Sequence, residues 1–178
     1  MSAVTFAIPE LETPRLILRA PQLADLKPVG EFFATERSHM VGGPRDLMGS
    51  WQELVVRLGH WVLNGYGLWH IVEKASNAFV GWTGIIFAPA WSEPELGWAL
   101  FEQAEGKGIA FEAALAARAF AARKFGLDGL ISHIAADNSR SRVLAERLGA
   151  THERDGDLLG KPCQIWRHPT VQTKRMGH

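Results

Sequence analysis

The stretch from residue 95 to residue 135 constrains the fold more than any other part of this 178-residue chain. An apolar run at 95–101 leads through a glycine-containing turn into an alanine-rich helical pattern at 107–125, which Gly126 closes, and a second apolar run follows at 130–135. A strand, a helix and a strand in this order require the two strands to lie parallel in one sheet. The fold must therefore contain a parallel strand pair.

The sequence before residue 95 predicts further elements of both kinds. They are a strand, two helices and two strands, expected at 13–19, about 21–33, about 46–63, 68–72 and 79–86. The last two runs should form an antiparallel meander with the run that begins at residue 95. The second helix is expected to carry Trp51, Leu54, Val55, Leu58 and Val62 on one apolar side.

After residue 135 the sequence predicts a helix at about 139–148 and two weaker strands near 151–154 and 163–168. The complete order is then β-α-α-β-β-β-α-β-α-β-β. This is the α+β class, with a mixed but mostly antiparallel central sheet flanked by helices. We expect a single domain at 1–170 and a C-terminal tail at 171–178.

Composition argues against several kinds of partner. The chain contains 19 Lys and Arg and 19 Asp and Glu residues, so a general basic surface for nucleic acid is not expected. The one cysteine, Cys163, permits no intramolecular disulfide. No run is apolar enough to span a membrane, and residues 1–10 lack the pattern of a secretory signal. We therefore expect a cytoplasmic protein without membrane or nucleic-acid partners; whether it forms a homodimer is left open.

The turn at Gly106-Lys107-Gly108 predicts a phosphate-binding site. Glycine lets the backbone turn tightly and approach a ligand closely. The first amides of a helix have no partner within the helix and carry the positive end of its dipole, so they bind phosphate groups. On its own a Gly-x-Gly turn is weak evidence, because many helices begin after glycine.

Several motifs around this turn together resemble a known superfamily. Gln103-x-x-Gly106-x-Gly108 follows Glu-Leu-Gly-Trp at 95–98 and is similar to the coenzyme A loop of the GNAT acetyltransferases. The segments at 13–19, 79–84 and 138–150 resemble other motifs of that superfamily, in the same order. The chain looks most like the branch of ribosomal-protein-alanine N-acetyltransferases. This resemblance implies a GNAT-like sheet that is splayed between its fourth and fifth strands.

The resemblance also implies an acetyl-CoA site without a metal. The loop amides would hold the pyrophosphate, and the strand before the loop would pair with the pantetheine arm. Asn138 would bond to the arm, Ser141 would lie near the thiol, and an amide near Leu100 would polarise the thioester carbonyl. The cofactor-binding positions so implied are Trp98, Leu100, Phe101, Gln103, Ala104, Glu105, Gly106, Lys107, Gly108, Ile109, Ala110, Asn138 and Ser141.

Catalysis requires a neutral acceptor amine, and Glu95 is the candidate base, acting directly or through water. A structural hydrogen bond would explain this residue equally well. Many members of the superfamily place a tyrosine seven positions after the asparagine, as the acid for the thiolate. Here that position is Ala145, and the only tyrosine, Tyr66, lies in a distant turn. Ser141 or a water would have to serve, or the thiolate would leave unprotonated.

Other reactive side chains favour structural roles. The seven histidines lack the close spacing of paired metal ligands, and His70 and His133 are expected in the core or the cleft. Cys163 is expected to be a small buried hydrophobe. Glu112 matches a family position, where a buried hydrogen bond and a catalytic role are both consistent with the sequence.

The predicted function is the transfer of an acetyl group from acetyl-CoA to a primary amine by direct attack in a ternary complex. The acceptor is either a protein N-terminus or a small-molecule amine. The alternative is a noncatalytic acyl-CoA-binding or sensing module on the same fold, which the alanine at position 145 keeps open.

Overall fold

The computed structural model describes residues 6–171, so the tail expected at 171–178 lies almost wholly outside the described residues. Eight strands form one sheet in the order β1-β2-β3-β4-β5-β6-β8-β7. Neighbouring strands are antiparallel except β5 and β6, which are parallel as the crossover requires. The strands are β1 (Leu11–Glu12), β2 (Leu16–Arg19), β3 (Leu68–Glu73), β4 (Ala78–Ile86), β5 (Glu95–Leu100), β6 (Ile131–Ile134), β7 (Thr151–Leu158) and β8 (Lys161–Arg167).

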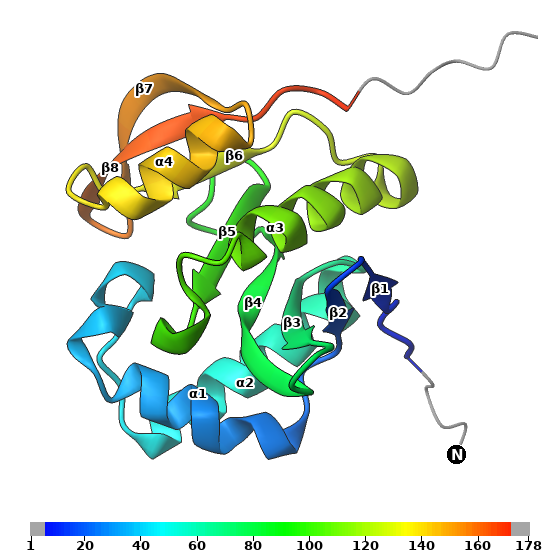
Figure 1. The fold of residues 1–178 in the computed structure, drawn as a ribbon. Coiled ribbons are helices and arrows are strands. Elements are labelled where there is room, and N and C mark those ends of the chain that lie inside the picture. The colour runs from blue at the N-terminus through cyan, green and yellow to red at the C-terminus, as the bar shows by residue number, and fades with distance from the viewer. Residues whose placement is uncertain (1–5, 172–178) are drawn as a thin grey trace, which may run out of the picture.

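Four α-helices flank the sheet, and their order confirms the predicted α+β class. In Figure 1, α1 and α2 lie together at one end of the molecule, and α4 lies with β6, β7 and β8 at the other. None of the helices within residues 6–171 is both long and apolar enough to cross a membrane. The helices are α1 (Leu26–Phe33), α2 (Leu47–Asn64), α3 (Ile109–Phe120) and α4 (Ser139–Arg147), with short helical turns at Leu23–Asp25, Glu36–Val41, Glu102–Ala104 and Ala121–Phe125.

The sheet separates two apolar cores, because side chains alternate between the two faces of each strand. On the α3 face, Trp69 and Ile71 of β3 pack with the alanines of the helix, including Ala113 and Ala117. On the α1 face, the helix packs its own apolar residues against Trp82 of β4. The small alanine side chains let α3 lie close to the sheet, which fixes where the helix begins relative to β5.

The buried face of α2 differs from the prediction. The helix buries Ser50, Leu54, Arg57 and Trp61, and of the five residues expected on its core side only Leu54 is buried. The indole of Trp61 donates a hydrogen bond to the carbonyl of Leu68, at 2.9 Å, which ties the helix to the start of β3. The apolar side that the sequence pattern predicted as core faces solvent instead.

Arg57 of α2 can be buried because it belongs to a network of charged and polar side chains with Asp25 and His70. Asp25 accepts two hydrogen bonds of 2.8 Å from Arg19 and one of 2.7 Å from Nδ1 of His70. Nε2 of His70 accepts from Arg57 at 3.1 Å, and the Arg57 guanidinium lies 3.8 Å from the centre of the Trp82 ring. Burial opposes ionisation of Asp25, but the hydrogen bonds from Arg19 and His70 hold its pKa well below its usual range.

A second buried histidine connects β5 and β6 through Ser132. Arg118 of α3 donates to Nδ1 of His168 at 3.3 Å, so Nε2 of this neutral ring donates to Ser132 Oγ at 2.9 Å. Ser132 in turn donates to the carbonyl of Leu96 at 2.6 Å. Burial and the charge of Arg118 lower the pKa of His168 to about 4, and burial lowers that of His70 to about 4. Both rings are therefore neutral in the folded chain at neutral pH.

Because the pKa values of His70 and His168 are lowered in the folded chain, we expect the folded chain to lose stability in mild acid. Unfolding exposes the rings, whose ordinary pKa is near ~6.5, so the unfolded chain takes up protons first as the pH falls from about 6.5 to about 4. The free energy of unfolding should fall by about 2 kcal/mol per histidine between pH 7.5 and pH 5. Urea titration at the two pH values measures this difference, and His70→Gln should remove about half of it. Equal stabilities at pH 5 and 7.5 would contradict the assignment.

Candidate active site

A cavity of about 1100 Å³ opens where β5 and β6 separate. It is lined by residues 96–100 of β5, by 132–134 of β6 and the residue after it, by the loop and first turn of α3, by the first turns of α4 and by the segment before α2. The two strands share a single register pair, Glu95 with Ile131, after which they diverge. The predicted splay between the fourth and fifth main strands, which are β5 and β6, is therefore confirmed.

The backbone of β5 presents free polar groups to this cavity. The amide of Phe101 donates to the carbonyl of Val80 on β4, at 2.9 Å. Because the amides of a strand point alternately to its two sides, those of Trp98 and Leu100 point toward β6, where pairing has ended. Phe101, which was predicted as a cofactor-binding position, is buried in the α1 core and is not among the residues that line the cavity. A ligand lying between the strands would find hydrogen-bonding groups at Trp98 and Leu100.

The glycine loop lines one side of the cavity. Gly106 and Gly108 have φ angles of +73° and +75°, which favour glycine, and α3 begins at Ile109. The amides of Ala104 and Glu105 already donate to carbonyls of the preceding turn. Gly106, Gly108, Ile109 and Ala110 line the cavity, whereas Gln103 and Lys107 are exposed. Of the positions predicted to hold the pyrophosphate at 103–110, the cavity is therefore lined by Glu105, Gly106, Gly108, Ile109 and Ala110.

Glu112 braces this loop from outside the cavity. Its carboxylate accepts hydrogen bonds from the Thr13 hydroxyl at 2.6 Å and from Arg15 Nε at 2.6 Å. Arg15 also donates to the carbonyl of Lys107 at 2.9 Å. Burial opposes the shift, but the bonds from Thr13 and Arg15 lower the pKa of Glu112 below its ordinary value. Of the two roles consistent with the sequence, these contacts favour the structural one.

The contacts of Glu95 indicate that it acts on the cavity through a neighbouring histidine and does not face the cavity itself. Its buried carboxylate accepts from the Trp91 indole, from the backbone amide of His133 at 3.1 Å and from His133 Nδ1 at 3.0 Å. It is His133 that lines the cavity. A carboxylate oxygen only accepts, so the hydrogen of this bond lies on Nδ1, and Nε2 is the ring nitrogen that can accept a proton. Glu95 thus orients a histidine that can accept a proton.

Sequence reasoning missed this pairing of Glu95 with His133, which are 38 positions apart. The sequence does contain a pattern that could have predicted the pairing. Each of the two residues lies at or near the start of one of the two strands that the crossover makes parallel. Parallel strands that begin together bring such residues to the same end of the sheet.

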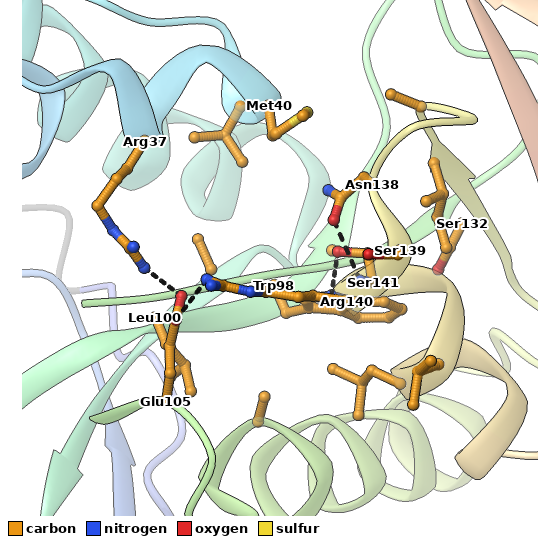
Figure 2. A pocket seen from close by; sticks show the side chains of 18 of the residues that line it. Arg37, Met40, Trp98, Leu100, Glu105, Ser132, Asn138, Ser139, Arg140 and Ser141 are labelled. Atoms are coloured by element: carbon orange, nitrogen blue, oxygen red, sulfur yellow. Dashed lines mark hydrogen bonds and ion pairs between the residues drawn. The ribbon is translucent and has the colours of Figure 1, made fainter. Parts of the chain in front are cut away.

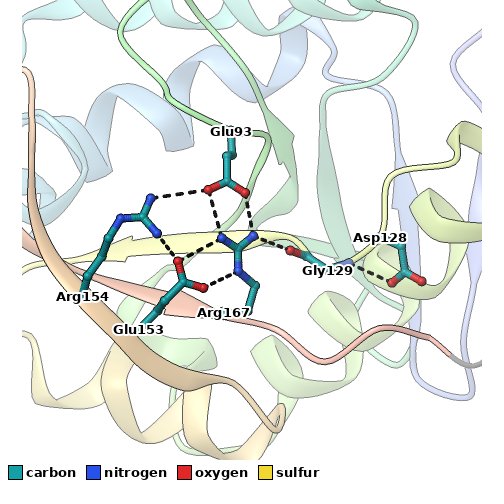
Figure 3. A network of polar contacts seen from close by, with 6 residues as sticks. All are labelled: Glu93, Asp128, Gly129, Glu153, Arg154 and Arg167. Carbon is teal, nitrogen blue, oxygen red and sulfur yellow. Dashed lines mark hydrogen bonds and ion pairs between the residues drawn. The ribbon is translucent and has the colours of Figure 1, made fainter.

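A surface network holds the loop that carries Trp91 and Glu95 (Figure 3). Arg167 of β8 donates to both carboxylate oxygens of Glu93, at 2.6 and 2.9 Å, and to Glu153 of β7 at 2.6 Å. Arg167 also donates to the carbonyl of Gly129, at 2.8 Å, just before β6. One guanidinium therefore ties the β4–β5 loop to three neighbouring segments, which restrains the loop next to Glu95.

Ser141 and Asn138 come from the start of α4. Asn138 Oδ1 accepts from the Ser141 amide at 3.1 Å and so caps the helix, which leaves its Nδ2 as the donor toward a ligand. The Trp98 indole donates to Ser141 Oγ at 3.2 Å, so the Ser141 hydroxyl hydrogen can be donated elsewhere. Both Asn138 and Ser141 line the cavity. Ala145 is fully buried in a small core with Trp166.

Two arginines that line the cavity converge on Glu105 (Figure 2). Arg37, from the turn between α1 and α2, bonds to one oxygen of Glu105, and Arg140 of α4 donates to the other at 2.6 Å. The sequence singled out Glu105 only as a loop position, and neither arginine was predicted. The three side chains link the glycine loop, α4 and the segment before α2 along the wall of the cavity.

The split between β5 and β6 and the start of α3 beside it form a cavity in which helix amides could bind a phosphate-bearing ligand. The family described as the acetyltransferase (GNAT) domain matches residues 15–151. The chain belongs to this family, as the resemblance of its motifs predicted. Membership supports the transfer of an acyl group from acetyl-CoA to an amine in general.

Solved structures agree with this assignment. An acetyltransferase from Agrobacterium tumefaciens strain C58 is 35% identical, with a TM-score of 0.85 over 94% of this chain and 98% of that chain. A protein from Bordetella pertussis placed among the GNAT-family acetyltransferases is 27% identical, with a TM-score of 0.76 over 90% and 99%. A ribosomal L7/L12 alpha-N-protein acetyltransferase in complex with coenzyme A is 17% identical, with a TM-score of 0.71 over 88% and 93%, and shares the fold.

A pair of glycines tests the anion site. Gly106 and Gly126 both have left-handed φ angles, +73° and +67°, and a Cβ added at either meets no other atom, but only Gly106 borders the cavity. Valine at either position strains the backbone by roughly 1–2 kcal/mol. Gly106→Val should weaken acetyl-CoA binding about tenfold in calorimetry, and Gly126→Val should leave the affinity unchanged. Equal affinity losses in both variants would argue against binding at the loop.

Proposed function

We propose that this protein transfers an acetyl group from acetyl-CoA to a primary amine, by direct attack while both substrates are bound. The acceptor is a protein N-terminus or a small-molecule amine. The observation that carries the proposal is the single cavity that joins an anion-binding loop at 106–110 to the His133–Glu95 pair. One ligand site and one proton acceptor thus open into the same space.

The residues of the cavity fit acetyl-CoA. The amides at 106–110 would hold the pyrophosphate, and the free edge of β5 would bond to the pantetheine arm together with Asn138 Nδ2. When bound, acetyl-CoA supplies the acetyl thioester. The amide of Leu100 points into the gap between β5 and β6, where it would donate to the thioester oxygen and stabilise negative charge on it.

His133 acts as the general base in this proposal. Nε2 accepts the proton that the amine must lose, and Nδ1 keeps its hydrogen bond to Glu95, which stabilises the imidazolium. In this proposal Glu95 is therefore a positioning residue, and His133 takes the role of base that the sequence analysis assigned to Glu95. At the other end of the reaction, the Ser141 hydroxyl donates a hydrogen bond that stabilises the departing thiolate, since its oxygen already accepts from Trp98, and the thiolate takes its proton from water.

A noncatalytic acyl-CoA-binding module is the second candidate. The observation in its favour is Ala145, which is buried in a small core and has no group to donate to a thiolate. The Ser141 hydroxyl and the His133–Glu95 pair favour catalysis, because a binding module needs neither.

A thiol-release assay with acetyl-CoA and a panel of amines separates the two. The panel contains peptides with free N-termini, lysine side-chain analogues, amino acids and polyamines. Release of free thiol together with an acetylated product by mass spectrometry supports the enzyme. Saturable acetyl-CoA binding with no product from any amine supports the binding module.

A further inference from the structure

The solvent-facing side of α2 carries an apolar stripe with regular spacing. Met48, Trp51, Val55, Leu58 and Val62 follow one another at intervals of three, four, three and four residues, and they are 36 to 61% exposed. This is the spacing at which helices pack along a shared seam. Within residues 6–171 no element covers these side chains, since the helix packs on the sheet through its opposite side.

The charges of α2 are confined to that opposite side. The helix contains one acidic and one basic residue, Glu53 and Arg57, and they bond to each other at 3.3 Å. The stripe itself contains no charged residue. A partner therefore needs no complementary charges, and a second, identical apolar stripe could pack against this one.

The size of the patch fits an interface. With Leu47 and Leu63 beside it, the stripe exposes on the order of 600 Å² of apolar surface, the upper end for the largest patch on a typical monomer. Two such faces in contact bury on the order of 1,200 Å², which is enough for a specific interface.

Gly59 is unexplained by the packing of one chain. It lies inside α2, where glycine lowers helix stability relative to alanine, and a Cβ added there meets no atom within 4 Å. It lies next to the stripe, between Leu58 and Val62 along the helix. Because glycine has no side chain, the solvent-facing surface of α2 is low at this position. Another molecule can therefore approach the helix closely there.

The stripe is close to symmetric about Val55. In two antiparallel copies of α2 that cross at Val55, Met48 meets Val62 of the second copy, and Trp51 meets Leu58 and Gly59. The largest side chain of the stripe thus faces the position without a side chain. A surface that matches itself when turned through a two-fold rotation is what a closed dimer requires.

We infer that this protein forms a two-fold symmetric homodimer in which the α2 helices pack antiparallel through this stripe. The occupant is a second copy of the chain, because the stripe is self-complementary in size and carries no charge. The interface lies at the end of the molecule that holds α1 and α2, away from α4 and β6 (Figure 1). It is independent of the proposed reaction.

Sedimentation equilibrium tests this inference with two neighbouring valines. Val55 lies at the centre of the stripe and Val56 lies off it, yet both are exposed, at 45% and 62%. The unaltered chain should sediment at twice its 19.6 kDa mass. Val55→Asp places two like charges at the two-fold axis and should raise the dimer Kd about 100-fold or more, whereas Val56→Asp should leave it unchanged. Circular dichroism confirms that both variants are folded.

Cross-linking gives a second readout. Val55→Cys should form a disulfide-linked dimer on oxidation, and Val56→Cys should not, because only Val55 lies on the axis; the native Cys163 is buried. A monomeric unaltered chain at about 100 μM overturns the inference, since the stripe would then serve a different partner. A dimer that survives Val55→Asp, or an assembly larger than a dimer, overturns it equally.

Discussion

Replacing His133 with glutamine should lower kcat about 100-fold or more at pH 7, with a much smaller change in the KM for acetyl-CoA. Glutamine can keep a hydrogen bond to Glu95, but it cannot accept the proton from the amine. The loss should shrink as the pH approaches the pKa of the acceptor, because the solution then supplies neutral amine. That occurs near ~8 for a protein N-terminus and near ~10.4 for a lysine-like amine, so the profile also distinguishes the acceptors.

Two further variants serve as controls. His152→Gln alters an exposed histidine on β7 and should leave kcat unchanged. Glu95→Gln should reduce kcat about tenfold, less than the loss at His133, because it weakens the orientation of the base without removing it. If Glu95→Gln abolished activity and His133→Gln had little effect, Glu95 would be the base and the assignment would be reversed.

Replacing Asp25 with alanine should strongly destabilise the folded chain. Asp25 is 3% exposed and is the only carboxylate bonded to Arg19 and His70 within the described residues. Its removal leaves Arg19 with an unpaired charge in a partly buried site and His70 without its partner. The expected cost is about 3–5 kcal/mol. Thermal unfolding should show a fall in Tm of about 10 °C.

The exposed pair Lys27–Glu31 on α1 supplies the matched control. Glu31→Ala removes a carboxylate from the same part of the fold, but in water, where such pairs contribute little. Its Tm should stay close to that of the unaltered chain. Equal and small changes in both variants would show that the Asp25 network does not stabilise α1 and α2.

The sequence predicted the backbone of the site better than its side chains. Gly106, Gly108 and the parallel crossover follow from local patterns, since glycine, helix period and strand alternation each act within a few residues. The pairing of Glu95 with His133 depends on the register of β5 against β6, which no local pattern contains. The convergence of Arg37 and Arg140 on Glu105 depends likewise on three distant segments.

The error in α2 has a different origin. The helix has two sides that can pack, and periodicity favoured the more hydrophobic one, with Trp51 and Val55. The structure buries the side with Arg57, because Asp25, His70 and Trp82 satisfy that guanidinium. A hydrophobicity pattern cannot predict that a charged side chain will be buried where other residues form hydrogen bonds with it. The same error points to the exposed stripe, which is unusual for a single chain in solution.

The most direct test of acetyl transfer in a ternary complex is intact-mass spectrometry with radiolabelled acetyl-CoA, before and after an amine is added. Direct attack predicts that the protein mass stays unchanged with acetyl-CoA alone, and that label appears in the amine product only when both substrates are present. His133→Gln should bind acetyl-CoA normally and slow this step. An acetylated protein that forms before the amine is added, and that passes its label to the amine, would contradict the account.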